Sequence, residues 1–91
     1  MKDKEKELEK IFKALANRRR LMILGLIRKK KQANVGEISE SIKLSFKSTS
    51  RHLAVLTSSG ILEKEQSGLY FIYSLASNPE EIVKKLLALI L

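Results

Sequence analysis

The spacing of apolar residues changes near Ile61, and this change limits the possible folds more than any other feature of the chain. Before it, apolar residues recur every three or four positions, which is typical of amphipathic helices. After it, two stretches with alternating apolar residues flank Ser67 and Gly68, a pair suited to a tight hairpin turn. The chain is therefore predicted to form several helices and then a two-stranded antiparallel hairpin.

The first thirty residues predict two amphipathic helices. One spans residues 3–16 and carries acids and lysines on its outer face. The other spans residues 18–30, with Asn17 as its N-cap and basic residues in its last turn, where they suit the helix dipole. The residues expected to point inward are Leu8, Ile11, Phe12 and Leu15 on the first helix and Leu21, Ile23, Leu24, Leu26 and Ile27 on the second.

Two further helices are predicted, separated by a tight turn. Residues 31–34 form a polar loop, residues 35–42 a helix of about two turns, and Ser45 can cap the next helix, which Gly60 ends. The second of these helices starts with Ser, Lys and Thr residues, as in a helix-turn-helix. The residues expected to be buried are Val35, Ile38 and Ile42 on the first and Leu53, Val55 and Leu56 on the second.

The segment after the hairpin predicts a last helix over residues 79–90. Asn78 would be its N-cap, Pro79 its first helical residue, and Glu81 would close a capping box. The hairpin is expected to pack through Leu62, Phe71, Tyr73 and Leu75. The fold class is thus mainly α with a β-hairpin wing, a winged helix-turn-helix in a single domain over residues 1–91. Its order is helix, helix, helix, helix, strand, strand, helix.

Composition excludes several kinds of site and location. The chain has no cysteine, which removes disulfides, thiolate metal ligands and cysteine nucleophiles. Its N-terminus is charged from the second residue, unlike a signal peptide. Its most apolar segment, residues 82–91, is far shorter than a membrane span. We therefore expect a cytoplasmic protein with no membrane partner.

Positive charge is concentrated in one segment of the chain. The formal net charge is +8, and residues 17–31 hold seven cations and no acids. Such a surplus points to a polyanionic partner. Arg18, Arg19 and Arg20 would stand at the end of their helix where the dipole disfavours cations, which leaves contact with a partner and simple solvation both open. For residues 28–31, a solvated helix end and contact with a nucleic-acid backbone are equally open.

Three segments, FKALANRRRLMIL, SRHLAVLTSSGIL and GLYFIYSL, resemble in order and spacing the ArsR/SmtB family of small dimeric bacterial and archaeal repressors. The resemblance covers nearly the whole chain. It implies a homodimer that binds operator double-stranded DNA, with the SRHL helix in the major groove; many members release the DNA when a metal binds. The matching positions are Leu15 to Asn17, Arg20, Ser50 to Leu53, Gly60, Ile61, Gly68 and Tyr73 to Leu75.

The residues that bind metals in this family are missing from the chain. Val35 to Glu37 replace the cysteine-containing motif, and the last helix has neither Asp nor His. We therefore expect no metal and no cofactor, so that any effector would be another ligand or a partner protein. The wing also departs from the family, because Leu69 stands where an Arg commonly follows the Gly.

Ser50 and His52 do not form a catalytic pair. Residues two apart point to nearly opposite sides of a helix, and no Asp lies nearby in sequence to orient the imidazole. A metal site at His52 would have to rely on carboxylates alone. No catalytic residue and no enzyme activity are predicted. For His52 we favour a supporting role, hydrogen-bonded to backbone near the wing, over direct contact with DNA.

The beginning of the helix that follows Ser45 carries side chains suited to DNA. An Arg can bind guanine O6 and N7 together, and Ser or Thr can contact phosphate or base. On the hairpin, Glu63 and Glu65 oppose a strong contact. The residues predicted to contact DNA are Lys47, Ser48, Thr49, Ser50 and Arg51 on the helix and Lys64, Gln66 and Ser67 on the hairpin.

The last helix is apolar around much of its circumference, more than one domain face needs. Pairing with the first helix of a second subunit would cover this surplus. The predicted function is a sequence-specific DNA-binding transcriptional regulator, a repressor, that acts as a homodimer. The alternative is a winged helix that binds a protein and contacts DNA weakly or not at all. The expected dimer interface comprises Leu8, Ile11, Phe12, Leu15, Ile82, Val83, Leu86, Leu87 and Ile90.

Overall fold

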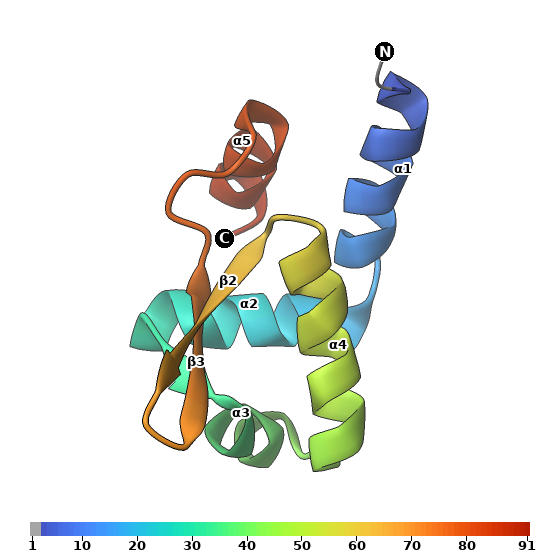
Figure 1. Ribbon diagram of the computed structural model, residues 1–91. Helices are drawn as coiled ribbons and strands as arrows, with labels where there is room; N and C mark the ends of the chain where they lie inside the picture. The colour runs from blue at the N-terminus through green and yellow to red at the C-terminus, as the bar shows by residue number, and fades with distance from the viewer. Residues whose placement is uncertain (1–2) are drawn as a thin grey trace.

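Residues 3–91, which the computed structural model describes, form five helices and one three-stranded sheet (Figure 1). This order confirms the predicted series of four helices, a hairpin and a last helix. The elements are α1 (Lys4–Leu15), α2 (Arg18–Lys30), β1 (Ala33–Asn34), α3 (Val35–Ile42), α4 (Phe46–Ser58), β2 (Leu62–Ser67), β3 (Tyr70–Leu75) and α5 (Glu81–Ile90).

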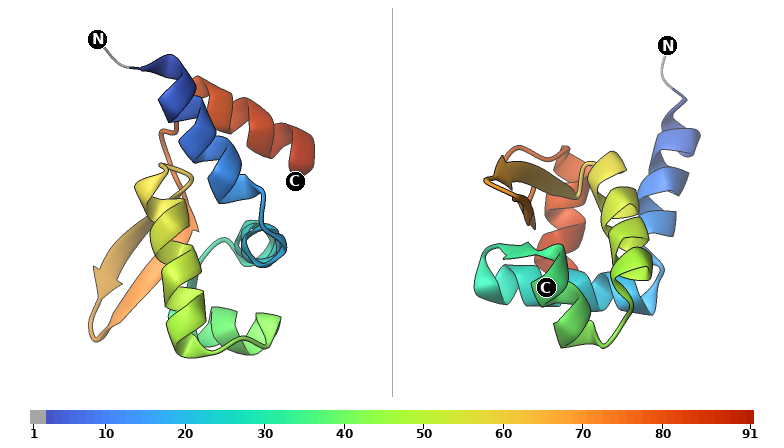
Figure 2. Two further views of the ribbon diagram at one scale, coloured as in Figure 1. Left: turned by 90° about the vertical axis from the view of Figure 1, so that its right-hand side faces the viewer. Right: turned by 60° about the horizontal axis from the view of Figure 1, so that its bottom comes forward.

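Helix α2 is the centre of the molecule. Seen end-on, it lies between α1 and α5 on one side and α3 and α4 on the other (Figure 2, left). Ile23, Leu24 and Ile27 are completely buried there. Leu21, expected to point inward, is 41% exposed. It lies roughly 115° around the helix from the centre of the buried stripe, so the predicted stripe was too wide.

The sheet has a third strand that the sequence did not predict. Residues Ala33 and Asn34, expected in a polar loop, form β1 and pair with β3, giving the antiparallel order β1-β3-β2. Two residues are too few to show any alternation, so no pattern could reveal this strand. Ala33 is buried, while the Asn34 side chain caps α3 in a capping box with Glu37.

The hairpin turn lies one residue later than predicted. Ser67 pairs with Tyr70, so Gly68 and Leu69 are the two central turn residues. Gly68 has a φ of 63°. A positive φ at the first central position is the pattern of a type II′ turn, which favours glycine and matches the twist of the strands. Leu69 is left at the tip and is 95% exposed.

Three residues expected in the core lie at its margin instead. Phe12 and Phe71 are 48% and 45% exposed, and Val55 is 37% exposed. Val55 could not share a helix face with Leu53, because residues two apart point in different directions. Burial of Leu62 and Tyr73 is confirmed, and Leu75 packs against the core.

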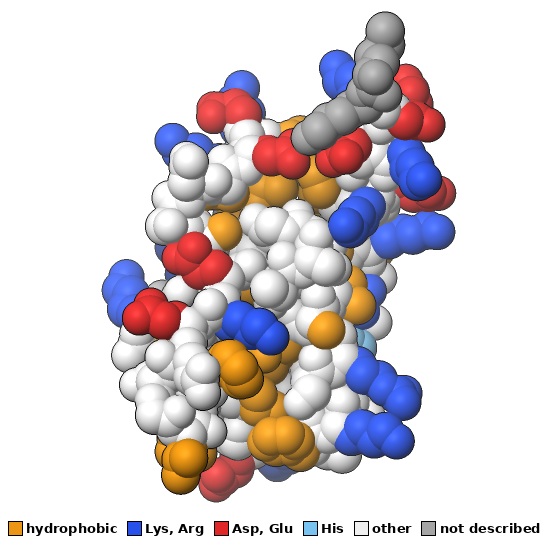
Figure 3. Space-filling view, in the orientation of Figure 1, with side chains coloured by type: hydrophobic (Ala, Val, Ile, Leu, Met, Phe, Trp, Pro, Cys, Tyr) orange, Lys and Arg blue, Asp and Glu red, His pale blue; other side chains and the backbone are white. Residues whose placement is uncertain are grey.

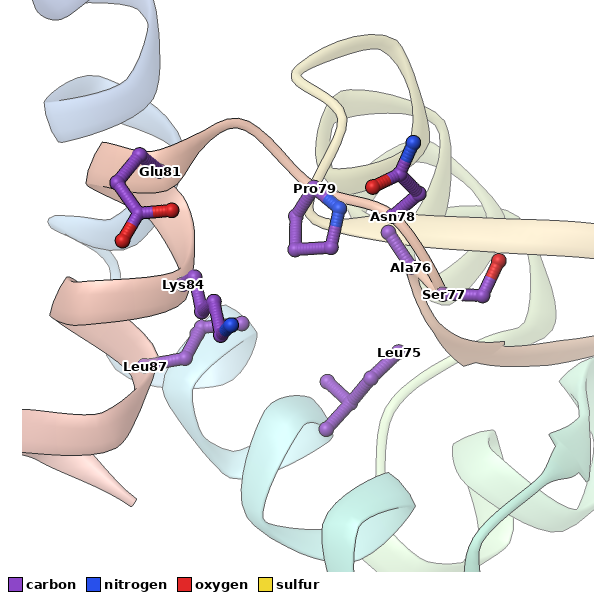
Figure 4. A pocket seen from close by; sticks show the side chains of 8 residues that line it. All are labelled: Leu75, Ala76, Ser77, Asn78, Pro79, Glu81, Lys84 and Leu87. Atoms are coloured by element: carbon purple, nitrogen blue, oxygen red, sulfur yellow. The ribbon is translucent and has the colours of Figure 1, made fainter.

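Helix α5 begins later than predicted and without the predicted cap. It starts at Glu81, and Glu80 at the N-cap position makes no side-chain capping hydrogen bond. Asn78 and Pro79 lie instead in the connection from β3, where they line a hollow of about 350 Å³ beside α5 (Figure 4). Only Val83 of α5 is fully buried, whereas Leu89 is 81% exposed.

Candidate nucleic-acid interface

Local hydrogen bonds set the angle between α3 and α4. Helix α3 ends at Lys43, which adopts the left-handed conformation with a φ of 55°, and the Leu44 N–H donates to the Ser39 carbonyl at 3.0 Å. Helix α4 then begins as predicted at the Ser45 cap, whose hydroxyl accepts from the Ser48 N–H at 3.1 Å. The two helices therefore form the predicted helix-turn-helix.

One stripe of α4 is free to meet a partner. At 100° per residue, Lys47, Arg51, Ala54 and Ser58 line up along the helix, and all four are exposed. The opposite side is anchored by Leu53 and Leu56, which are completely buried. Lys and Arg side chains project from this edge of the molecule in the space-filling view (Figure 3).

Thr49 does not belong to this stripe. Its side chain is completely buried on the same side of α4 as Leu53, and its hydroxyl has no hydrogen-bond partner. The prediction that Thr49 contacts DNA was therefore wrong, because the residue lies on the inward face of its helix. Ser48 and Ser50 are half-buried on either flank of the exposed stripe.

Arg20 joins three helices through one guanidinium group. It lies on α2, and its Nε donates to the Ala14 carbonyl at 2.6 Å and its Nη2 to the Lys13 carbonyl at 2.9 Å, both at the end of α1. Its Nη1 lies 3.1 Å from Nδ1 of His52 on α4. The predicted backbone hydrogen bond of His52 near the wing was wrong, since the ring meets an arginine side chain on the flank toward α2.

The charges around His52 disfavour its protonated form. Burial of the imidazole, and then the positive charges of Arg20 and Arg19, hold the pKa of His52 below its ordinary value of 6.5. Arg19 is itself engaged, because its Nη1 donates to the Ile42 carbonyl at the end of α3 at 2.8 Å.

The sequence alone does not decide whether these two arginines contact a partner or only solvent. The signal that could have revealed their role is their position against the dipole of α2, which calls for nearby acceptors with at least partial negative charge. Those acceptors are the carbonyl groups at the ends of α1 and α3.

The wing offers little positive charge to DNA. Its Lys64 ammonium group lies 4.7 Å from the centre of the Phe71 ring, a cation–π contact. The Gln66 side-chain amide donates to the Gly68 carbonyl at 3.4 Å across the turn. Ser67, the last residue of β2, is exposed.

An apolar surface lies between the wing tip and the start of α4. Phe46, Leu69, Tyr70 and Phe71 are 63%, 95%, 61% and 45% exposed and line one hollow of about 300 Å³. We call these four residues the wing-tip surface. Hydrophobic side chains gather at the lower end of the molecule in Figure 3.

The nine residues assigned to a dimer interface differ in burial. Ile11, Leu15 and Val83 belong to the core of the single chain, so a partner could touch them only slightly. Phe12 and Ile90 are 48% and 47% exposed. The half-buried members are Leu8, Ile82, Leu86 and Leu87.

Comparison with known proteins identifies the family. Residues 17–64 match the model of the family described as "Bacterial regulatory protein, arsR family". This chain belongs to the ArsR family. It is similar to the transcriptional activator HlyU of Vibrio cholerae serotype O1, with 34% identity over 77 residues, or 85% of this chain and 70% of HlyU.

Solved structures agree with this assignment. One is the homodimeric winged helix-turn-helix DNA-binding domain of Mb0332 from Mycobacterium bovis, a possible ArsR-family transcriptional regulator. Its TM-score is 0.79 at 32% identity, covering 93% of this chain and 75% of that one. Another is the transcriptional repressor PagR of Bacillus anthracis, with a TM-score of 0.76 at 25% identity and 97% coverage of each chain.

This ArsR-family chain is therefore a DNA-binding transcriptional regulator with a winged helix-turn-helix fold and not an enzyme. Among residues 3–91, no helix is both long and apolar enough to cross a membrane. In the same part of the chain, no three His, Asp or Glu side chains gather where they could hold a metal ion.

Proposed function

We propose that this regulator acts in the cytoplasm as a homodimeric repressor that binds a short inverted repeat. The exposed stripe of α4 carries the proposal, because Lys47 and Arg51 project from the first two turns of the second helix of a helix-turn-helix. In such motifs, these turns lie in the major groove and reach base edges. Two copies would place their α4 helices roughly 34 Å apart on the DNA.

The proposed contacts fall into two kinds. Arg51 and Lys47 read base edges, and Ser48 and Ser50 on the flanks of the stripe bind phosphate. On the wing, Lys64, Gln66 and Ser67 follow the neighbouring phosphates. Because Lys64 also packs on Phe71, and Glu63 and Glu65 stand beside it in β2, the wing contributes less than α4.

Exposed apolar groups support the dimer. Phe12 on α1 and Leu89 and Ile90 on α5 leave large apolar side chains in solvent in the single chain. Burying them against a second subunit would stabilise the dimer by a free energy of about 25 cal/mol per Å² of apolar surface buried. The Mycobacterium bovis domain of the same fold is described as homodimeric. A monomer in sedimentation at micromolar concentration would contradict this part of the proposal.

The deciding experiment is selection of bound sequences from a random DNA pool, followed by binding assays on the selected duplex. Selection should return an inverted repeat with half-sites about one helical turn apart. Affinity for it should fall by orders of magnitude between low and moderate salt, as expected if roughly 6–10 phosphates are neutralised. A flat salt response, or no enriched sequence, would refute operator binding.

Point variants separate base reading from phosphate binding. Arg51→Ala should weaken binding to the selected duplex by roughly 5- to 150-fold and binding to scrambled DNA much less. Lys64→Ala should weaken both alike. Lys4→Ala removes the same charge at the first residue of α1, the end of that helix near the N-terminus (Figure 1), and should change neither. Equal losses of DNA affinity for Arg51→Ala and Lys4→Ala would show that α4 does not contact the DNA.

The wing-tip surface favours a second function, binding of a protein partner. Four large apolar side chains around one hollow are unusual on a surface that meets only solvent. If the surface binds a protein, Leu69→Ser should abolish capture of that protein and leave DNA affinity unchanged. If it lies against DNA, the same variant should weaken binding to the selected duplex.

A further inference from the structure

We propose that Arg20 and His52 are positioning residues that hold α4 at the end of α1, and that protonation of His52 releases α4 and weakens specific DNA binding. The inference rests on the proposed role of α4 in reading DNA. It assigns a part in that function to two residues that need not touch DNA at all, and it makes the proton an effector of the regulator.

The contact fixes the protonation state of His52. A guanidinium group has only donors, so the imidazole nitrogen 3.1 Å from Arg20 Nη1 must accept the hydrogen bond. His52 Nδ1 is therefore unprotonated, and in the neutral ring the proton is on Nε2. The other two nitrogens of the same guanidinium, Nε and Nη2, donate to the carbonyls of Ala14 and Lys13, so Arg20 cannot turn away without breaking its hydrogen bonds to α1.

Protonation would turn this attraction into repulsion. A proton on Nδ1 would set a donor against a donor and an imidazolium cation beside Arg20 and Arg19 of α2. Arg51, the neighbour of His52 on α4, is also a cation. On α1, Lys13 has its ammonium group 3.8 Å from Glu9. Arg19, Arg20 and Arg51 therefore surround the ring with positive charge, which repels its protonated form.

The sign of the pH effect follows. Because burial and the two arginines lower the pKa of folded His52, the unfolded chain binds a proton more readily than the folded one below pH 6.5. The stability that the contact contributes is complete above the unfolded pKa and declines below it. The contact itself is lost as the pH falls through the lower folded pKa. The link should therefore be intact at pH 7.5 and should weaken only as the pH falls through the folded pKa of His52, which lies below 6.5.

Loss of this link would act on both the helix and the dimer. His52 lies one residue from Arg51, so a shift of its flank also moves the exposed stripe. The end of α1 that Arg20 holds is part of the helix that carries Phe12, a proposed dimer contact. The Arg20–His52 contact thus links the orientation of α4, the helix proposed to read the DNA, to α1. Helix α1 would in turn set the spacing of the two half-sites through the dimer.

The test measures the affinity of the full chain for its selected duplex and for scrambled DNA at constant ionic strength, from pH 7.5 down to the lowest pH at which the chain stays folded. Circular dichroism verifies that the chain stays folded over this range. Specific affinity should fall by about fivefold to tenfold, as for a loss of one positioned contact, and scrambled DNA should be bound nearly equally throughout. If His52 touched phosphate directly, acid would strengthen binding to both duplexes, which would overturn the proposal.

Two variants give controls. His52→Asn keeps a neutral acceptor near the position of Nδ1 but cannot be protonated, so it should bind nearly as well as the wild type at pH 7.5 and lose the pH dependence. Arg20→Lys has one nitrogen where the guanidinium uses three, so it should keep fewer of these hydrogen bonds, and the variant should bind DNA more weakly at every pH. A decline for His52→Asn as steep as that of the wild type would refute the role of His52.

A measurement without DNA keeps the contact testable by itself. His52 is the only histidine of the chain, so the two imidazole signals in nitrogen NMR, from Nδ1 and Nε2, can come only from its ring. The Nε2-protonated form should dominate at pH 7.5 and titrate below 6.5. An Nδ1-protonated ring would overturn the inference even if DNA binding is found. Failure to bind any DNA would instead refute the proposed function together with the DNA part of this inference.

Discussion

Basic side chains cluster at both ends of α2, but the two clusters have different surroundings. At the first end, Arg19 and Arg20 are half-buried and donate to the carbonyls that end α3 and α1. At the other end, residues 28–31 are exposed. Of these four residues, only Lys30 forms an ion pair, with its Nζ 3.6 Å from a Glu37 oxygen.

Magnitudes explain why the unfavourable cluster is tolerated. A cation at the wrong end of a helix dipole costs about 0.3–1 kcal/mol. A hydrogen bond from a charged donor contributes about 1.5–3 kcal/mol. The arginines stand at the beginning of α2 but also at the ends of two other helices, whose free carbonyls carry partial negative charge. The neighbouring helices, and not α2 itself, decide the sign of their contribution.

The largest expected effect comes from removing Arg20. Arg20→Met should lower the free energy of unfolding by about 2–4 kcal/mol, because two carbonyls and the His52 ring lose their donor. Lys29→Met, the matched change at the other end of α2, should stay within about 0.5 kcal/mol. Urea unfolding of both variants measures the difference. Equal losses would show that the two clusters do not differ.

Removal of Arg19 should have a smaller and more local effect. Arg19→Met leaves the Ile42 carbonyl without its donor and should cost about 1–2 kcal/mol. Amide hydrogen exchange should accelerate in α3 more than in α1. Arg18→Met is the control, since Arg18 is the exposed member of the same cluster. Equally faster amide exchange in all helices would contradict a local role of Arg19 at the end of α3.

The smallest effect should be a gain in stability. Lys31 ends α2 with a φ of 78°, a conformation that suits glycine better than a residue with a side chain. Lys31→Gly should therefore raise the free energy of unfolding by about 0.5–1 kcal/mol. Lys29→Gly, inside the helix, should lower it by about 1 kcal/mol. Thermal unfolding of the pair decides; a loss for Lys31→Gly would mean that its side chain contributes to stability.

The features that could be predicted are those encoded within a few neighbouring residues. The predicted caps Asn17 and Ser45 are present in the structure, because each side chain accepts a hydrogen bond from the backbone N–H three residues later. Leu53 and Leu56 are buried as their spacing predicted. Thr49 was misplaced because composition at the start of α4 suggested DNA contacts, whereas its angle around the helix puts it with the buried leucines.

The sequence by itself determined the winged helix-turn-helix and the family. Helix periodicity, strand alternation and motif order can be recognised along the chain without knowing which residues are in contact. Only the tertiary structure decided where the basic residues of α2 act. The partners of Arg20 are 6, 7 and 32 residues away, and that of Arg19 is 23 away. Which carbonyl a side chain bonds depends on which helix ends lie next to it in space. Helix packing decides that, and the local sequence pattern does not show it.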